Sequence, residues 1–182
     1  ALTPGQNPLN AVSCILFCLS LIALYSASGI YHFSRAAANV LVVLRKLDHA
    51  MIYVLIAGTY TPLLLGLLPA PRAEVFTAVI WGVALAGIVM KLCWINAPRW
   101  LGTTLYLLLG WAIAIDLPAL AALPVPAVAL LAAGGLLYTA GGLIYMIKRP
   151  NLSERFGFHE IFHLFVIAGS LCHYFLVLLY IA

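Results

Sequence analysis

Charged residues are scarce in this 182-residue chain, at 8% of the sequence against 65% for hydrophobic residues. With a mean hydropathy of +1.13, the composition lies far outside the range of soluble globular domains. The few basic residues fall in short loops, so the net charge of +4 indicates orientation in a membrane and gives no reason to expect nucleic acid as a partner. The sequence therefore predicts an integral membrane protein whose partners are membrane lipids.

Sequence features typical of several other classes of protein are also missing. The 4 cysteines form no C-x-x-C pair, so no disulfide is predicted and the cysteines are not expected to bind metal. No Ser/Gly-rich linker and no long run of like charge is present, which leaves no sign of a domain boundary or a disordered tail. We therefore expect residues 1–182 to form a single membrane domain.

Six apolar runs are each close to the roughly 20 residues that a helix needs to cross about 30 Å of hydrocarbon. They cover residues 9–33, 50–68, 75–94, 101–121, 127–147 and 160–181. Prolines punctuate most of the connections between them. The expected fold class is all-α, a polytopic membrane helix bundle with six spans.

Basic residues fall on alternate loops between these runs. One set of loops carries only Arg72, whereas the other set carries Arg35, Arg45, Lys46, Lys91, Arg99, Lys148, Arg149 and Arg155. By the positive-inside rule, the second set is cytoplasmic. Both ends of this chain, including the C-terminus, are then expected on the outer side.

Four polar residues fall at the predicted cytoplasmic ends of the spans: His32 ends the first, Asp48 begins the second, and His159 and His163 begin the sixth. An aspartate at the centre of a spanning helix costs roughly 2.5 kcal/mol or more, so such residues usually have a function. Residues four apart share a helix face, so His159 and His163 are able to bind one ion, and Ser28 lies beside His32. Three imidazoles with a water in the fourth position form a catalytic zinc arrangement.

The segment from His159 to His163 also reads H-E-x-x-H, the signature of zinc metalloproteases in which the glutamate is the general base. Such enzymes normally place a further ligand after the motif, whereas the candidates His32 and Asp48 precede it here. Glu160 is better explained as a first-turn acid favoured by the helix dipole.

Two further histidines are set apart from this cluster. His49 follows Asp48 directly, about 100° further around the helix, so we expect an interfacial residue and not a ligand. His173 lies ten residues beyond His163, about 15 Å further along the axis, which is too far for the same ion. A helix-to-helix hydrogen bond is its expected role.

Together these segments are similar to those of a known family. The motifs are Ser28-Gly-Ile-Tyr-His32, Arg45-Lys-Leu-Asp48-His-Ala, Ile56-Ala-Gly-Thr-Tyr-Thr-Pro62, and His159-Glu-Ile-Phe-His163 through Gly169-Ser-Leu-Cys-His173. They resemble the hemolysin III branch of the progestin and adipoQ receptor family, and the resemblance extends from the first predicted span to the last. It implies a seven-helix membrane protein, so we expect that the family's first helix is missing from this chain.

The resemblance also implies a zinc site near the cytoplasmic face. Carried over by position, the ligands are His32, His159 and His163, with Asp48 holding the metal-bound water and Ser28 beside it. Relatives in the receptor branch can carry glutamine next to the first histidine of the pair, which weakens Glu160 as an obligatory base.

Zinc lowers the pKa of its bound water and polarises a carbonyl, and Asp48 is the best-placed base, which together give hydrolysis of an amide or ester. The family resembles the alkaline ceramidases, so the leading hypothesis is a zinc-dependent hydrolase that releases fatty acid from a lipid in the bacterial plasma membrane. The alternatives are a receptor or membrane-homeostasis protein with structural zinc, a cytolytic channel, and an intramembrane metalloprotease. The outer halves of the spans contain few polar residues, which argues against a conducting pore.

Overall fold

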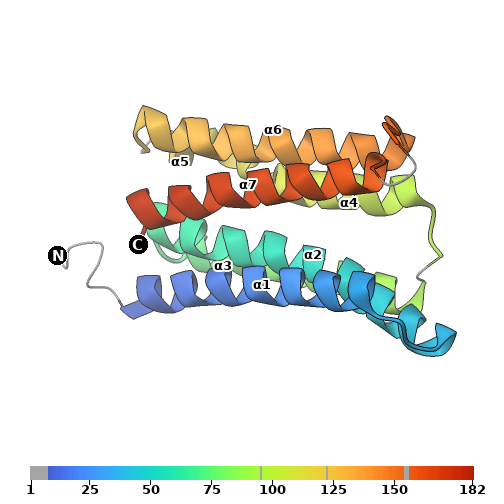
Figure 1. Ribbon diagram of the computed structural model, residues 1–182. Helices are drawn as coiled ribbons and strands as arrows, with labels where there is room; N and C mark the ends of the chain where they lie inside the picture. Colours follow the sequence, from blue (N-terminus) through green and yellow to red (C-terminus); the bar gives the residue numbers. More distant parts are fainter. Residues whose placement is uncertain (1–7, 95, 122, 154–155) are drawn as a thin grey trace. The chain divides into compact units, whose positions relative to one another are not determined.

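The structure is a computed structural model that describes residues 8–94, 96–121, 123–153 and 156–182. Over these residues the chain is helical, without strands. The elements are α1 (Pro8–Phe33), α2 (Ala38–Leu67), α3 (Arg72–Cys93), α4 (Arg99–Gly110), the 3₁₀ helix η2 (Ala112–Asp116), α5 (Leu117–Leu120), α6 (Val125–Ile147) and α7 (Phe158–Tyr180), as Figure 1 shows. The predicted all-α fold class is confirmed.

Five helices in the described part of the chain are long and apolar enough to cross a membrane, namely α1, α2, α3, α6 and α7. They correspond to five of the six predicted runs, and the chain is an integral membrane protein. The helix α2 begins at Ala38, well before the predicted run at residue 50. Its 30 residues make it about 45 Å long, which exceeds a hydrocarbon layer of about 30 Å.

The fourth predicted run, residues 101–121, is not one continuous helix. After α4 the chain changes to a 3₁₀ helix, in which the Ala114 N–H bonds to the carbonyl of Trp111 at 3.0 Å. Pro118 lacks the N–H that would bond to the carbonyl of Ala114, and its ring clashes with that carbonyl in a regular α-helix. Gly110 adds a weak helix former just before the change. This run is therefore an interrupted helix in a chain of otherwise long spans.

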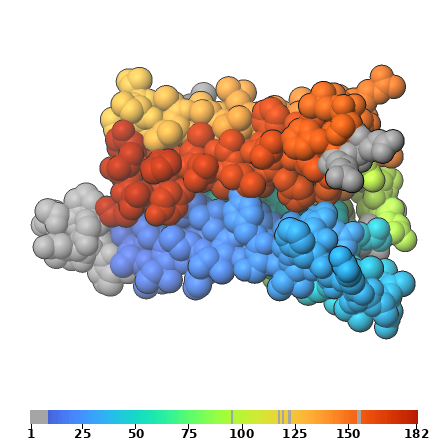
Figure 2. Space-filling model, in the orientation of Figure 1, coloured from blue at the N-terminus to red at the C-terminus, as the bar shows by residue number. Residues whose placement is uncertain are grey.

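The side chains of α1 show the inside-out arrangement expected in lipid. Ser13 and Ser20 are buried, and each hydroxyl donates to a backbone carbonyl three residues earlier at 2.7 Å. Large apolar side chains point outward instead, among them Ile15, Leu19 and Ile22, at 56–62% exposure. The blue side chains of α1 lie open at the surface in Figure 2. A hydrocarbon environment accepts this apolar face without cost.

By its internal contacts the chain divides into two compact units, residues 1–97 with 181–182, and residues 98–180. In the first unit, α2 packs against both α1 and α3. In the second, α6 packs along α7 and also contacts α4. The single membrane domain expected from the sequence stays a prediction.

Close packing in the first unit depends on Gly87 of α3. The ring of Tyr53, which is 1% exposed, occupies the space that a Cβ at this position would need. The same helix contains Gly82, whose added Cβ would meet nothing within 4 Å. These two glycines form a matched pair for testing the α2–α3 contact.

We expect Gly87→Ala to destabilise the protein by about 1–3 kcal/mol, because overpacking displaces a large buried ring. Gly82→Ala should leave stability unchanged or raise it by up to about 1 kcal/mol, since alanine is the better helix former. Thermal unfolding in detergent checks both, at about 2–4 °C per kcal/mol for a chain of this size. Equal midpoints for the two variants would contradict the packing described for Tyr53.

In the second unit, the helix α6 ends at a residue with left-handed backbone. Lys148 has φ 61° and ψ 35°, a conformation that costs a side-chain-bearing residue about 1 kcal/mol and costs glycine almost nothing. Its N–H still closes the helix on the carbonyl of Ile144 at 2.9 Å.

Lys148→Gly should therefore stabilise the protein by about 1 kcal/mol. Lys148→Ala removes the same charge but retains a Cβ, so it should bring no such gain. Thermal unfolding of the two variants separates backbone strain from charge, and a gain shared by both would show that the charge is responsible.

Candidate metal centre

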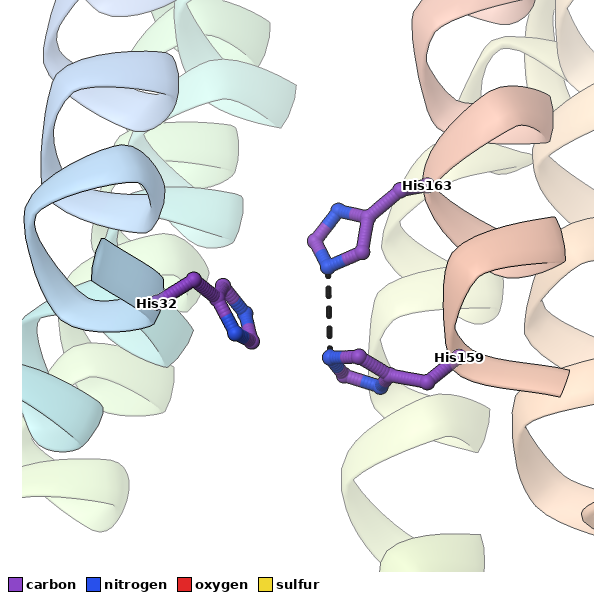
Figure 3. A group of neighbouring side chains, drawn as sticks. All are labelled: His32, His159 and His163. Carbon is purple, nitrogen blue, oxygen red and sulfur yellow. Dashed lines mark hydrogen bonds between the residues drawn. The ribbon is translucent and has the colours of Figure 1, made fainter. Parts of the chain in front are cut away.

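His159 and His163 lie one turn apart in the first part of α7, and both are half-buried. Their Nε2 atoms are 3.2 Å apart. The rings stand nearly perpendicular, at 87°, with centroids 4.7 Å apart. Figure 3 shows both imidazoles projecting from the same face of α7. The helix thus presents two nitrogen ligands close together.

This spacing fits a shared zinc ion. Tetrahedral zinc binds imidazole nitrogen at about 2.0–2.1 Å, which places two ligand nitrogens about 3.3 Å apart. The observed 3.2 Å matches that value. With the metal on Nε2, both rings would carry their proton on Nδ1. The donor chemistry of the pair is therefore suited to zinc.

Aromatic rings surround the first histidine of the pair. Tyr145 of α6 lies 6.0 Å from His159 and 5.0 Å from Phe162, between ring centroids. The Arg99 guanidinium, at the start of α4, lies 5.2 Å from the centroid of the Tyr145 ring and 5.7 Å from that of Phe158. These contacts restrain the Tyr145 ring from several sides. Sequence reasoning missed Tyr145 and Arg99, because no local pattern links residues on three different helices.

Two side chains cap the beginning of α7. The Gly157 N–H donates to Glu160 Oε2 at 2.8 Å, and the Phe158 N–H donates to Asn151 Oδ1 at 3.1 Å. These are orphan donors of a first helical turn. Glu160 is solvent-exposed and serves as the predicted first-turn acid.

Replacing Glu160 by glutamine should leave zinc content unchanged and reduce any turnover by less than about tenfold, because a general base is worth about 10²–10⁴-fold. The glutamine amide oxygen still accepts from the Gly157 N–H, so the helix cap is kept. Metal analysis and an activity assay on the same preparation check this prediction. A loss of more than about 100-fold with zinc retained would favour the metalloprotease hypothesis instead.

In the first unit, Ser28 and His32 share one face of α1, and His32 lies in the last turn of that helix. Figure 3 shows His32 at this helix end. Its side chain is exposed, and its ring centroid is 4.7 Å from that of Tyr31. An imidazole in this position also complements the helix dipole when it is protonated.

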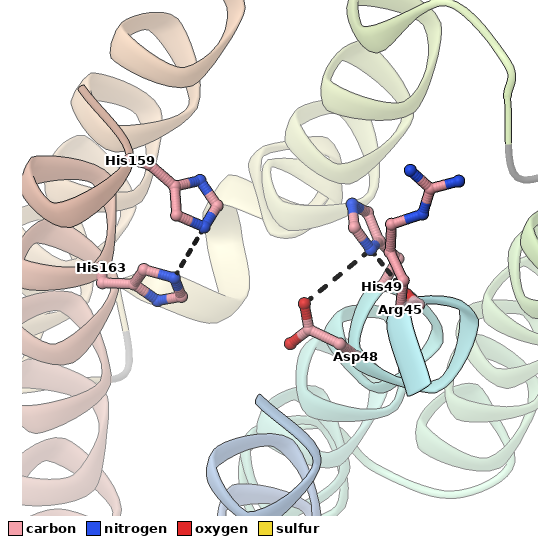
Figure 4. Close-up of polar contacts among 5 residues, drawn as sticks. All are labelled: Arg45, Asp48, His49, His159 and His163. Atoms are coloured by element: carbon pink, nitrogen blue, oxygen red, sulfur yellow. Dashed lines mark hydrogen bonds and ion pairs between the residues drawn. The ribbon is translucent and has the colours of Figure 1, made fainter. Parts of the chain in front are cut away.

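Asp48 and His49 lie in the first half of α2. Their side chains are 13% and 22% exposed, and His49 Nδ1 is 3.8 Å from Asp48 Oδ2. His49 Nδ1 lies 2.7 Å from the Arg45 carbonyl oxygen, so an Nδ1–H donates there. Figure 4 shows this arrangement of Arg45, Asp48 and His49. His49 therefore bonds to its own helix through Nδ1 and lies against the Asp48 carboxylate.

His173 makes the predicted helix-to-helix contact. Its Nε2 is 3.4 Å from the carbonyl oxygen of Leu131 on α6, and its ring lies 5.4 Å from that of Tyr138. A Cβ on Gly134 would overlap the imidazole, so the glycine makes room for it. The expectation of a hydrogen bond for this residue is confirmed.

The predicted site residues thus fall into three local groups: Ser28 with His32 on α1, Asp48 on α2, and His159 with His163 on α7. The first two groups belong to one unit and the third belongs to the other. Within its own unit, each of the two pairs, Ser28 with His32 and His159 with His163, has the one-face placement that helical spacing predicts.

Comparison with known proteins gives one family. The profile described as Haemolysin-III related matches residues 1–174. The protein named Hemolysin-3 homolog from Bacillus subtilis is 38% identical over 172 residues, which cover 94% of this chain and 78% of the relative. Hemolysin-3 from Bacillus cereus is 36% identical over 171 residues, covering 93% of this chain and 75% of the relative. No solved structure matches the chain significantly.

Proposed function

Because this chain belongs to the haemolysin-III-related family of membrane proteins, we propose that it binds one zinc ion through His32, His159 and His163 and hydrolyses a lipid amide or ester. Its location would be the bacterial plasma membrane, which fits the bacterial relatives. The zinc site would lie near the cytoplasmic face, with the C-terminus outside.

The histidine pair of α7 is the observation that carries this proposal. Its two Nε2 atoms are 3.2 Å apart, which is the spacing of two ligands on one tetrahedral zinc ion. Support for the third ligand comes from the loop charges, which assign the end of α1 and the beginning of α7 to the same membrane face. His32 is the histidine at that end of α1.

Zinc would supply Lewis acidity, polarising the substrate carbonyl and making a water more acidic. Asp48 is the carboxylate proposed to accept the proton of the attacking water, and a base in this role contributes about 10²–10⁴-fold. Beside it, His49 Nδ1 lies 2.7 Å from the Arg45 carbonyl oxygen and 3.8 Å from Asp48 Oδ2. Ser28 offers a hydroxyl, one turn from His32, to hold the polar part of the substrate.

A lipid substrate is favoured by the setting of the α7 pair. Phe158, Phe162 and Tyr145 contact the ring of His159 with centroid distances of 6.0–6.2 Å. Such rings accept an acyl chain, whereas a charged or water-soluble substrate would be desolvated there without compensation. The exposed faces of the helices are apolar as well, so the surrounding solvent is lipid.

The test is a metal and turnover analysis of the purified full chain. About one zinc per chain is expected, together with release of fatty acid from a panel of ceramides and lipid esters. Absence of stoichiometric zinc would overturn the metal site. Zinc without turnover of any lipid would instead favour a receptor or membrane-homeostasis protein in which zinc holds the helices together.

A further inference from the structure

In the first unit, α2 and the last turn of α3 bring together three cations, Arg45, Lys46 and Lys91, here called the basic cluster. Arg45 Nη2 donates to Asn96 Oδ1 at 3.3 Å, just beyond α3. Lys46 Nζ donates to the carbonyl of Leu92, the neighbour of Lys91. The three residues therefore lie around one end of the α2–α3 pair.

Within the described part of the chain, Arg45 has N–H donors without an acceptor. A guanidinium carries five N–H donors. Among the described residues, its one side-chain acceptor is Asn96, and its buried Nε has no hydrogen-bond partner. Neither Arg45 nor Lys46 forms an ion pair with a described carboxylate. Because the Nε is buried, an external phosphate would meet the terminal Nη groups of Arg45, whose parallel N–H donors match the paired oxygens of a phosphate.

Lys91 is 4% exposed, which is rare for a lysine. Helix capping explains only part of this basic cluster, because the cation that bonds to a terminal carbonyl of α3 is Lys46. A buried lysine near a half-buried arginine and a half-buried lysine concentrates positive charge in one place. The nearest described carboxylate along α2 is Asp48, which lies 3.8 Å from His49 Nδ1.

We propose that the basic cluster binds the phosphate of an anionic phospholipid headgroup. The cluster lies where the long α2 leaves its uncharged stretch, and basic pockets between spanning helices bind such lipids. Arg45 would bind the phosphate through its guanidinium, and the buried Lys91 would add positive charge nearby. This role is independent of zinc and of lipid hydrolysis.

The test uses the full chain in nanodiscs of phosphatidylcholine, with and without phosphatidylglycerol. The anionic lipid should raise the unfolding midpoint of the wild type by about 2–4 °C. Arg45→Gln should abolish this shift, and Lys91→Met should do so as well. Arg72→Gln, which removes one charge from the opposite end of α3, should keep it. Lys91→Met replaces a buried residue, so this variant is at risk of not folding. The result for Arg45→Gln, at a half-buried position, is sufficient to decide the test without it.

A second arm adds inorganic phosphate to the phosphatidylcholine nanodiscs. No shift is expected, which identifies the lipid as the source of the phosphate group. A shift with inorganic phosphate that Arg45→Gln abolishes would overturn the lipid assignment in favour of a soluble phosphate compound. Equal loss of the lipid effect in Arg72→Gln and Arg45→Gln, or no lipid effect in the wild type, would overturn the site.

Discussion

His159→Ala is expected to lower the zinc content of the purified protein from about one ion per chain to near zero. The variant removes one of two nitrogens that lie 3.2 Å apart on α7. Loss of groups that only orient a ligand already costs about 10–100-fold in affinity, so loss of a ligand itself should cost more than about 100-fold. Metal analysis after purification without added zinc measures the effect.

His49→Gln is the matched control for this experiment. It also removes an imidazole near the predicted cytoplasmic edge, but His49 Nδ1 is engaged with the Arg45 carbonyl. This variant should retain zinc. A chelator should lower the unfolding midpoint of the wild type and leave that of His159→Ala unchanged, because a metal that binds the folded state stabilises it. Zinc retained by His159→Ala would show that the α7 pair is not the site.

Asp48→Asn should keep the zinc and lose turnover by about 10²–10⁴-fold. Asparagine has nearly the shape of aspartate, but it is unable to accept a proton from an attacking water. The side chain is only 13% exposed, so the substitution alters a confined position. Measurement of fatty acid release under saturating lipid, with zinc content determined in parallel, separates the two effects.

Glu74→Gln serves as the control for Asp48→Asn, because it neutralises an exposed carboxylate in the first turn of α3. It should leave turnover unchanged. Unchanged turnover in Asp48→Asn would remove Asp48 from the mechanism. Loss of zinc from the same variant would make Asp48 a metal ligand and not a base.

Much of the fold was predictable because a membrane-spanning helix is recognised from a contiguous run of apolar residues. The run at residues 160–181 contains one acid, and α7 spans Phe158–Tyr180. The role of Glu160 as a first-turn acid was also predictable, since the donors that it satisfies belong to its own helix turn. The alternative interpretation of Glu160, as the general base of an H-E-x-x-H motif, came from the same five residues. The motif alone therefore did not separate the two roles.

The interruption at residues 111–116 was harder to predict. Hydropathy treats the run at residues 101–121 as one span, because it scores side-chain polarity and contains no information about backbone hydrogen bonds. Pro118 was visible, but its effect extends backward to the carbonyl of Ala114. The early start of α2 was missed for a related reason: hydropathy detects what lies in hydrocarbon, and the first turns of α2 are helical without being uniformly apolar.

The sequence by itself determined the membrane environment, the family, and the placement of His159 and His163 on one helix face. Composition and helical spacing are properties of contiguous residues, and they need no knowledge of packing. Only the tertiary structure decided that the two Nε2 atoms converge to 3.2 Å, that Tyr145 lies beside His159 with Arg99 over its ring, and that Arg45 meets Asn96. These features depend on side-chain rotamers and on contacts between helices that are remote in sequence. Side-chain packing fixes both, and neither produces a periodic pattern in the sequence.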